Sequence, residues 1–409
     1  MRRGVTVTAA LLAVVALAGA ASAFAYAEGA YGSLVYASDS RAMAMGGAGI
    51  ASAEGVRGIA LNPALVGKAE GIDVMLTVLG INAEESREVP LYDSFEGIIA
   101  YNTYAMNSNL YDRYVGGIAW RPGGDYEWMP AVAVGYGPRL DMRYNYHVQY
   151  RDSDTQAEPT DKILYDYWME NDGGVNAYSV AVAQEVMDKL FLGIGVDFLR
   201  GDADAEQRWI YPEDSENEDA ELWSSYDDLS GTQFTVGLLS EQLHRVDIGV
   251  VYRSSFTLAG DYSMEDAEGE VEEGEFESKY PDAIAVGLEY HPRNELMTTV
   301  SFDVVYTRWS EFESDLDEDV DFEDTVEYRA GVEHQFFDTT QARFGFAYQP
   351  AYFDEHTTRT VFTFGLGLDV LGVRVDVGGQ MGVREYGVDE DGRLRETTSV
   401  GTVTVWHTF

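Results

Sequence analysis

Large apolar residues alternate with small or polar residues along most of the chain after about residue 72. Residues 190–198 show the pattern clearly, since bulky side chains occupy every second position of the run Leu190, Phe191, Leu192, Gly193, Ile194, Gly195, Val196, Asp197 and Phe198. A period of two residues is the mark of a β-strand whose two faces meet different surroundings. The chain is therefore predicted to be all-β.

Strict alternation predicts fourteen strands, at about 72–82, 113–122, 129–148, 175–186, 189–208, 222–240, 244–262, 279–291, 296–312, 325–336, 341–353, 357–369, 372–387 and 395–409. An even number is typical of single-chain bacterial outer-membrane barrels. Residues 93–104 fit either a fifteenth strand or part of the first long loop, and the even count favours the loop. The fold expected is a fourteen-stranded antiparallel transmembrane β-barrel over residues 71–409.

Short and long connections alternate down the chain, and the last strand ends on the aromatic residue Phe409. Barrels of this kind place their short turns in the periplasm and their long loops outside the cell. The pattern therefore predicts an outer-membrane protein of a Gram-negative-type envelope with extracellular long loops. Its surroundings would be outer-membrane lipid and lipopolysaccharide.

The first residues are typical of an export signal. Arg2 and Arg3 precede an apolar stretch over 5–20, and small residues follow at 21–23 and 25–27, where a signal peptidase could cut. An N-terminal membrane anchor is the alternative, but the apolar stretch is short for a transmembrane helix. Residues 1–27 are predicted to be a signal peptide.

Composition excludes several function classes. The sequence has no Cys, which removes disulfides, thiol nucleophiles and thiolate metal sites. Its 71 acidic residues against 27 basic ones argue against nucleic-acid binding. Six histidines are present, but no HExxH, GxSxG or P-loop motif accompanies them. An enzymatic function and a cofactor are therefore not expected.

Acidic residues concentrate in four segments predicted as long loops, 150–174, 201–228, 260–279 and 311–327. Solvation of exposed loops is the simplest explanation. Binding of divalent cations, alone or as bridges to lipopolysaccharide, is the other. Asp315, Asp317, Asp319 and Asp321 alternate, but Val320 stands where a calcium loop of the EF-hand type needs Gly. No protein metal site is assigned.

Residues 31–67 do not follow the strand pattern. They are rich in Gly and Ala, and Asn62-Pro63 is a turn or helix-entry signal. Such a segment is too polar to face lipid and too apolar for a free tail. Residues 28–70 are predicted to form a hatch inside the barrel lumen, with an ordered periplasmic extension as the alternative.

Two motifs resemble one family. The first is Arg41, Ala42, Met43, Ala44, Met45, Gly46, Gly47, Ala48 and Gly49, followed by Asn62, Pro63 and Ala64. The second is Tyr280-Pro281-Asp282 opening a strand, with a partner strand that ends at 306–312 in YTRWSEF. Both are similar to outer-membrane transporters of long-chain fatty acids and aromatic hydrocarbons (FadL-type). They show weaker similarity to PorV-like barrels that serve secretion systems.

The resemblance implies passive uptake of hydrophobic molecules, most simply long-chain fatty acids or aromatic hydrocarbons, through a hatch-gated barrel. The hatch motif would be Arg41, Met43, Met45, Gly46, Gly47, Gly49, Asn62, Pro63 and Ala64. Apolar residues of the predicted loops are candidate substrate contacts or loop packing: Leu164, Tyr167, Trp168, Trp209 and Trp223. Arg253, Arg329, Arg343 and Arg374 are candidate lumen charges. A secretion-associated or structural barrel is the alternative function.

The export signal and the strand pattern make a first prediction. The mature protein should begin near Phe24 or Glu28, fractionate with the outer membrane, and change its gel mobility on heating. A soluble periplasmic protein whose mobility is independent of heating would contradict both interpretations.

Overall fold

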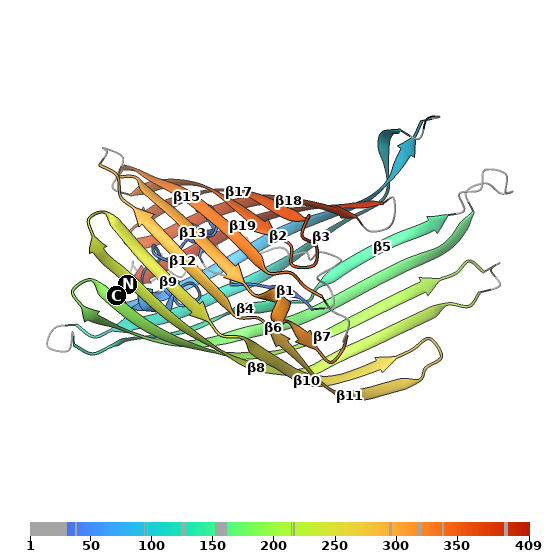
Figure 1. Ribbon diagram of the computed structural model, residues 1–409, viewed down its shortest axis with the longest axis horizontal. Helices are drawn as coiled ribbons and strands as arrows, with labels where there is room; N and C mark the ends of the chain where they lie inside the picture. Colours follow the sequence, from blue (N-terminus) through green and yellow to red (C-terminus); the bar gives the residue numbers. More distant parts are fainter. Residues whose placement is uncertain are drawn as a thin grey trace.

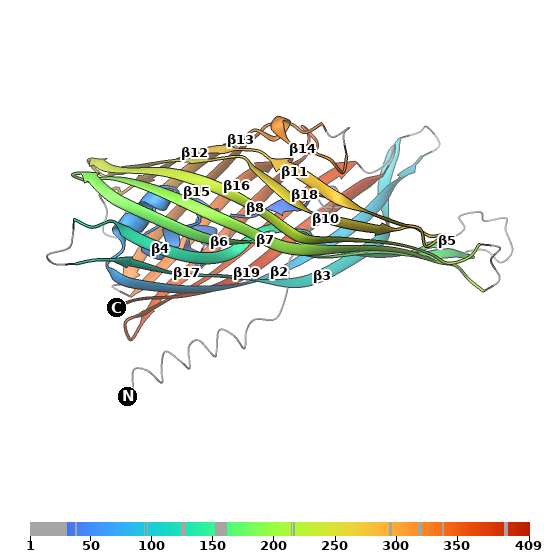
Figure 2. The same ribbon diagram turned by 90° about the horizontal axis from the view of Figure 1, so that it is seen from below.

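The computed structural model describes residues 31–36, 39–93, 95, 97–123, 128–151, 162–213, 215, 217–293, 297–317, 321–337, 339–387 and 392–409. It is a long antiparallel barrel with a small helical segment inside it (Figures 1 and 2). No helix in this part of the chain is long and apolar enough to cross a membrane.

The predicted number of strands is confirmed. Within the described residues, three of the fourteen barrel strands are interrupted and carry two labels each: β4 (Ala131–Asp141) with β5 (Tyr144–Arg151), β9 (Val246–Arg253) with β10 (Phe256–Glu265), and β11 (Val271–Tyr280) with β12 (Ala283–Tyr290). The other eleven are β2 (Gly71–Tyr92), β3 (Ile98–Arg121), β6 (Ile163–Met187), β7 (Leu190–Ile210), β8 (Ala220–Leu243), β13 (Thr299–Thr307), β15 (Thr325–Phe337), β16 (Thr340–Pro350), β17 (Thr358–Val370), β18 (Val373–Gly387) and β19 (Arg393–Thr408). Two-residue strands add to the sheet: β1 (Ser33–Leu34) pairs with β4, and β14 (Glu313–Ser314) pairs with β11.

The ring closes through its first and last strands. β19 pairs antiparallel with β2 from Arg393 opposite Glu88 to Thr408 opposite Asp73. Closure gives the backbone groups along this seam hydrogen-bond partners, which is the condition for strands to cross a lipid bilayer. The predicted closed antiparallel barrel is therefore confirmed.

The predicted alternation sorts side chains to the two faces of the wall. On β12, Ile284, Val286 and Leu288 are exposed on the outer face, whereas Ala283, Ala285 and Gly287 point inward. Large apolar residues outside and small ones inside are what a lipid-facing wall with a filled lumen requires.

The two ends of the barrel differ. One end, called here the short-turn end, carries the tight turns after β6, β8 and β17 and the C-terminal Phe409 (Figure 1). Lys189, Arg245 and Leu371 adopt positive φ there, as two-residue hairpin turns demand. At the opposite long-strand end, β6, β7, β8, β10 and β11 project well beyond the rest of the wall (Figure 2).

Two sequence predictions about the long-strand end were wrong. The segments 150–174, 201–228 and 260–279 are not mainly loops, since β6 begins at Ile163, β7 continues to Ile210 and β11 begins at Val271. Residues 98–104 are not loop either, but the first part of β3. Paired strands outside lipid tolerate polar residues on both faces, so the apolar alternation that marks a strand in the wall is lost there.

Residues 39–69, called here the inner segment, lie inside the ring of strands (Figure 2). They form α2 (Ser40–Ala44) and the 3-10 turns η2 (Gly55–Gly58) and η3 (Pro63–Lys68). The Asp39 carboxylate caps α2 through Ala42 N, and the Asn62 side chain caps η3 through Ala64 N. The turn signal at Asn62-Pro63 thus begins η3, where Pro63 costs no hydrogen bond.

Close approach of two backbones fixes the inner segment against the wall. Gly46 has a φ of +74° and lies against β15 and β16. A Cβ on Gly331 would come within 2.5 Å of Met45 O, and one on Gly345 would clash with Gly46 N. Glycine on both partners therefore lets the segment dock without a gap.

Polar wall residues bind the inner segment's backbone. The buried Asp303 carboxylate on β13 accepts N–H groups from Gly49 at 2.7 Å and Ile50 at 3.0 Å. Thr363 on β17 accepts the Gly46 N–H at 2.9 Å and donates to Ala44 O at 2.9 Å. These bonds replace the water that a buried, irregular backbone would otherwise need.

Replacing Asp303 with Ala should loosen the inner segment. Two buried N–H groups would lose their acceptor, at a cost of about 1–3 kcal/mol each. Amide hydrogen exchange at Gly49 and Ile50 in detergent should accelerate about tenfold or more.

Asp197→Ala is the matched control, because Asp197 pairs with Arg139 and Ser179 on the wall. Exchange at 49–50 that is equally fast in both variants would show that Asp303 is not the anchor.

Candidate functional site: a cavity on the long-strand side of the inner segment

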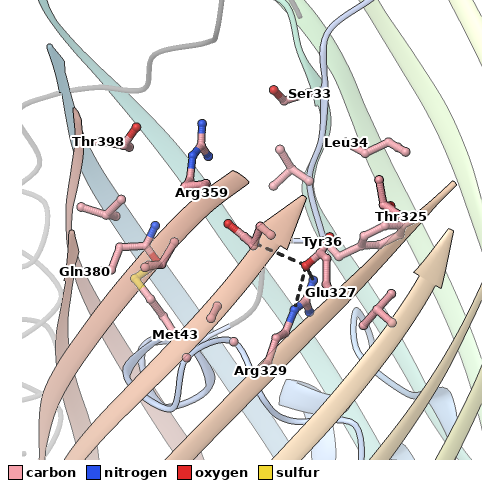
Figure 3. A pocket seen from close by; sticks show the side chains of 18 of the residues that line it. Ser33, Leu34, Tyr36, Met43, Thr325, Glu327, Arg329, Arg359, Gln380 and Thr398 are labelled. Carbon is pink, nitrogen blue, oxygen red and sulfur yellow. Dashed lines mark hydrogen bonds and ion pairs between the residues drawn. The ribbon is translucent and has the colours of Figure 1, made fainter. Parts of the chain in front are cut away.

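A cavity of about 320 Å³ lies between the inner segment and the long-strand end. Its floor is the inner segment, through Met43, Gly46, Gly47 and Leu61. Residues 33–36 run along it, and the wall supplies the remaining sides (Figure 3).

The lining combines apolar and cationic side chains. Apolar residues of the wall and of the strand ends are Leu79, Ile81, Val305, Trp309, Val361 and Val400. The arginines are Arg113, Arg253, Arg329, Arg359 and Arg384, whereas Asp39 and Glu327 are the lining carboxylates. A cavity of this composition suits an apolar molecule that carries a negatively charged group.

Arg253 is the most informative of these arginines. Its side chain is buried, donates to the carbonyl oxygens of Ala60 at 3.2 Å and Leu61 at 2.8 Å, and lies 4.3 Å from the Tyr36 ring centroid. No ion pair among the described residues includes Arg253. A buried guanidinium held by carbonyls and an aromatic ring keeps its positive charge available to an anion.

Arg329 is neutralised by comparison. It donates to Glu327 at 2.7 Å, and Glu327 also accepts from Gln349 at 3.3 Å (Figure 3). Both arginines line the cavity, but in the described part of the chain only Arg329 has a carboxylate partner, so Arg253 is the better anion receptor.

An aromatic cluster covers the cavity toward the long-strand end. Trp309 stacks on Tyr352 at 3.9 Å between centroids, and Phe312, Phe322 and Tyr31 pack beside them. The Tyr31 hydroxyl donates to Asp317 at 3.1 Å, and burial together with Asp317 raises the pKa of Tyr31 to about 12. The tyrosine is therefore a neutral donor at physiological pH.

The wall beside the cavity contains a break. β3 pairs with β4 only from Trp120 opposite Val132 to Gly116 opposite Tyr136. Beyond that point β4 follows β6 to Asp141 opposite Gly174, with a register shift after Pro138, and β1 pairs with its end from inside. The wall strand thus leans inward and leaves β3.

Arg113 stands at this break. It donates to Asp141 at 2.8 Å, and Asp141 also accepts from Arg143 at 2.8 Å. A hollow of about 400 Å³ in the wall includes Tyr114, Tyr136, Pro138 and Arg113. Arg113 lines both this hollow and the inner cavity, so its ion pair separates the two spaces.

The predicted hatch residues all lie in the inner segment. Met43, Gly46 and Gly47 face the cavity, Met45 and Ala64 are fully buried, and Gly49 is held by Asp303. Arg41 donates to Glu333 at 3.1 and 3.2 Å. Asn62 donates to Ile50 O at 2.9 Å and Leu238 O at 3.1 Å, and Pro63 follows it in η3.

The predicted lumen charges divide into two groups. Arg253 and Arg329 line the cavity. Arg343 is fully buried against Glu333 at 2.5 Å and Asp376 at 2.6 Å, and Arg374 pairs with Asp369 and Asp376 near the short-turn end. The second group therefore forms a carboxylate–arginine network in the lumen wall.

The structure does not bring the candidate apolar contacts to the cavity. Leu164, Tyr167, Trp168, Trp209 and Trp223 lie on the projecting parts of β6, β7 and β8. Trp168 stacks on His147 at 3.7 Å, and Tyr167 packs on Trp209 at 5.1 Å. The prediction that they lie in loops is wrong, because all five belong to strands.

Sequence reasoning missed the residues of the wall break. Arg113 and Asp141 are 28 positions apart and carry no motif. Two sequence signals were available: Gly137-Pro138 within a predicted strand, and the glycine pair Gly173-Gly174. Pro and Gly mark irregular positions in a sheet.

Residues 173–362 match a family described as "Outer membrane protein transport protein (OMPP1/FadL/TodX)". The predicted resemblance to FadL-type barrels is confirmed. No curated protein sequence matches the chain.

Solved FadL-type structures share the fold. A Pseudomonas aeruginosa FadL homologue is 15% identical with a TM-score of 0.68, over 92% of this chain and 100% of that one. The Pseudomonas putida toluene transporter TodX is 16% identical with a TM-score of 0.64, over 90% and 97%. The Ralstonia pickettii toluene transporter TbuX is 15% identical with a TM-score of 0.57, over 91% and 98%.

Replacing Arg253 with Gln should weaken binding of an anionic amphiphile to the barrel. A hydrogen bond to a charged group contributes about 1.5–3 kcal/mol, so dodecanoate should bind at least tenfold more weakly, while dodecanol binds almost unchanged. Titration calorimetry in detergent measures both.

Arg374→Gln is the control, because Arg374 lies in the second group of lumen charges. Equal loss of dodecanoate and dodecanol binding in Arg253→Gln would indicate damage to the cavity rather than loss of an anion receptor.

Proposed function

We propose that the protein carries hydrophobic molecules with an acidic group, most simply long-chain fatty acids, passively across the outer membrane. The observation that carries this proposal is the cavity, where apolar wall residues lie beside the buried Arg253 guanidinium. Aromatic hydrocarbons fit the apolar part alone and would leave that charge unused, so they are the second substrate class.

The two faces of the wall support the proposed placement in the membrane. The apolar outer face supports lipid contact, and the matched family consists of outer-membrane transport proteins. The short-turn end would face the periplasm and the projecting strands the exterior, as in other bacterial barrels.

Substrate would be captured from the exterior side. The aromatic pairs on β5, β6 and β7 offer apolar surface above the membrane, and the cluster around Trp309 and Tyr352 covers the cavity below. An amphiphile would slide between these rings and settle its charged group on Arg253.

A bound molecule could leave the cavity by either of two routes. The inner segment can shift as a hatch and release it toward the periplasm. The alternative is sideways passage through the wall break, once the Arg113–Asp141 ion pair opens. We propose the hatch as the main route, because the inner segment forms the floor of the cavity through Met43, Gly46, Gly47 and Leu61.

A reversible lock tests the hatch. The chain has no Cys, and a Cβ built on Gly378 of β18 lies 3.7 Å from Ala44 Cβ of α2, close to the mean separation in disulfides. The double variant Ala44→Cys/Gly378→Cys should take up labelled oleate as wild type does when reduced, and at least tenfold more slowly when oxidised.

The two single-cysteine variants control for the substitutions and for the oxidant. Uptake that survives complete oxidation of the double variant would contradict the hatch and favour the sideways exit. Uptake equal in cells with and without the protein would contradict transport itself.

A further inference from the structure

Three potential metal ligands meet at the short-turn end of the lumen. Asp247 on β9 and Glu289 on β12 stand directly opposite each other in the antiparallel ladder. His291 follows Glu289 by two positions, and its backbone N–H donates to Arg245 O at 3.0 Å. The ladder therefore presents all three side chains on one face.

Their geometry is compact. One ligand atom from each of Asp247, Glu289 and His291 lies within 4.8 Å of the other two. His291 Nε2 is 3.3 Å from Asp247 Oδ2, and its Nδ1 is 3.5 Å from Thr299 Oγ1. A partner on Nδ1 orients the ring, as outer-shell groups do for metal-binding imidazoles.

Asp247 and Glu289 place two carboxylates together with little positive charge to balance them, which favours a bound cation. Like charges directly opposite on neighbouring strands are destabilising. Within the described residues, the buried Glu289 has one ion-pair partner, Arg41 Nη2, at the long distance of 3.5 Å. Lys68 lies close by but pairs with Glu241 at 2.7 Å and Glu54 at 3.2 Å.

We propose that Asp247, Glu289 and His291 bind a divalent transition-metal ion, with Zn²⁺ as the best fit. Two carboxylate oxygens and one imidazole nitrogen match the ligand types of zinc, with water completing the tetrahedron. Ca²⁺ and Mg²⁺ prefer sites made only of oxygen, so the imidazole disfavours them.

The ion would bind where the wall touches the inner segment. Arg41 of α2 contacts Glu289 and also donates to Glu333 at 3.1 Å and 3.2 Å. A cation on Glu289 would compete with Arg41 and leave Glu333 as the carboxylate that Arg41 pairs with. Metal binding would thus alter one wall contact of the inner segment, whatever molecule the barrel transports.

Zinc binding to the purified full-length protein in detergent tests the site. Calorimetry with ZnCl₂ should show one ion per chain that is lost, or bound at least tenfold more weakly, in Asp247→Asn, Glu289→Gln and His291→Gln. His291 is half-exposed in a turn, so its variant keeps the fold testable through the heat-dependent mobility of the barrel.

His356→Gln is the matched control, because His356 also lies beside a carboxylate, Glu355 at 3.5 Å, but is highly exposed. It should bind zinc as wild type does, and CaCl₂ titrations should be the same for all variants. Equal zinc stoichiometry and affinity in His291→Gln and wild type would overturn the proposal, as would an equal loss in His356→Gln.

Discussion

Closure of the hydrogen-bonded ring is the constraint on which the other features depend. A strand in lipid has no water to satisfy its backbone, so the sheet must close, and the seam between β19 and β2 does this. A ring of fourteen strands encloses more space than its own inward side chains fill. The inner segment fills that space, and small inward residues such as Gly331 and Gly345 let it reach the wall.

Filling the lumen with irregular backbone creates a second demand, because its polar groups need partners. The wall meets this demand with Asp303, Thr363 and Thr404, each of which binds backbone of the inner segment. Buried carboxylates in turn need cations, and Arg343 between Glu333 and Asp376 is the clearest case. Arg253 departs from this pattern, since carbonyl groups and Tyr36 hold it. That difference makes it a candidate for substrate binding rather than for lumen structure.

The sequence predicted the fold better than the site, for a physical reason. Lipid outside and a packed lumen inside impose a period of two, which can be read along one strand such as β12. Outside the membrane both strand faces meet water, so the starts of β6 and β11 looked like acidic loops. The cavity and the proposed metal site depend on register between distant segments: Arg113 meets Asp141 beside the cavity, and His291 meets Asp247 44 positions away at the short-turn end. No local pattern encodes such meetings, although Gly137-Pro138 did mark the irregular stretch.

The strong negative charge of the chain does not conflict with an anionic substrate. Acidic residues of β10 and β11 lie at the tips of the projecting strands, and Glu265 is twelve residues beyond Arg253. At about 3.3 Å per residue this is roughly 40 Å along the strand. Screening reduces exposed charges over about 8 Å at physiological ionic strength, so the tips have little influence on the cavity. The electrostatic potential in the cavity depends on Arg253 and its neighbours, because these buried groups are screened less than the exposed strand tips. Acidic strand tips can therefore keep the exterior soluble while the lumen retains the positive charge of Arg253.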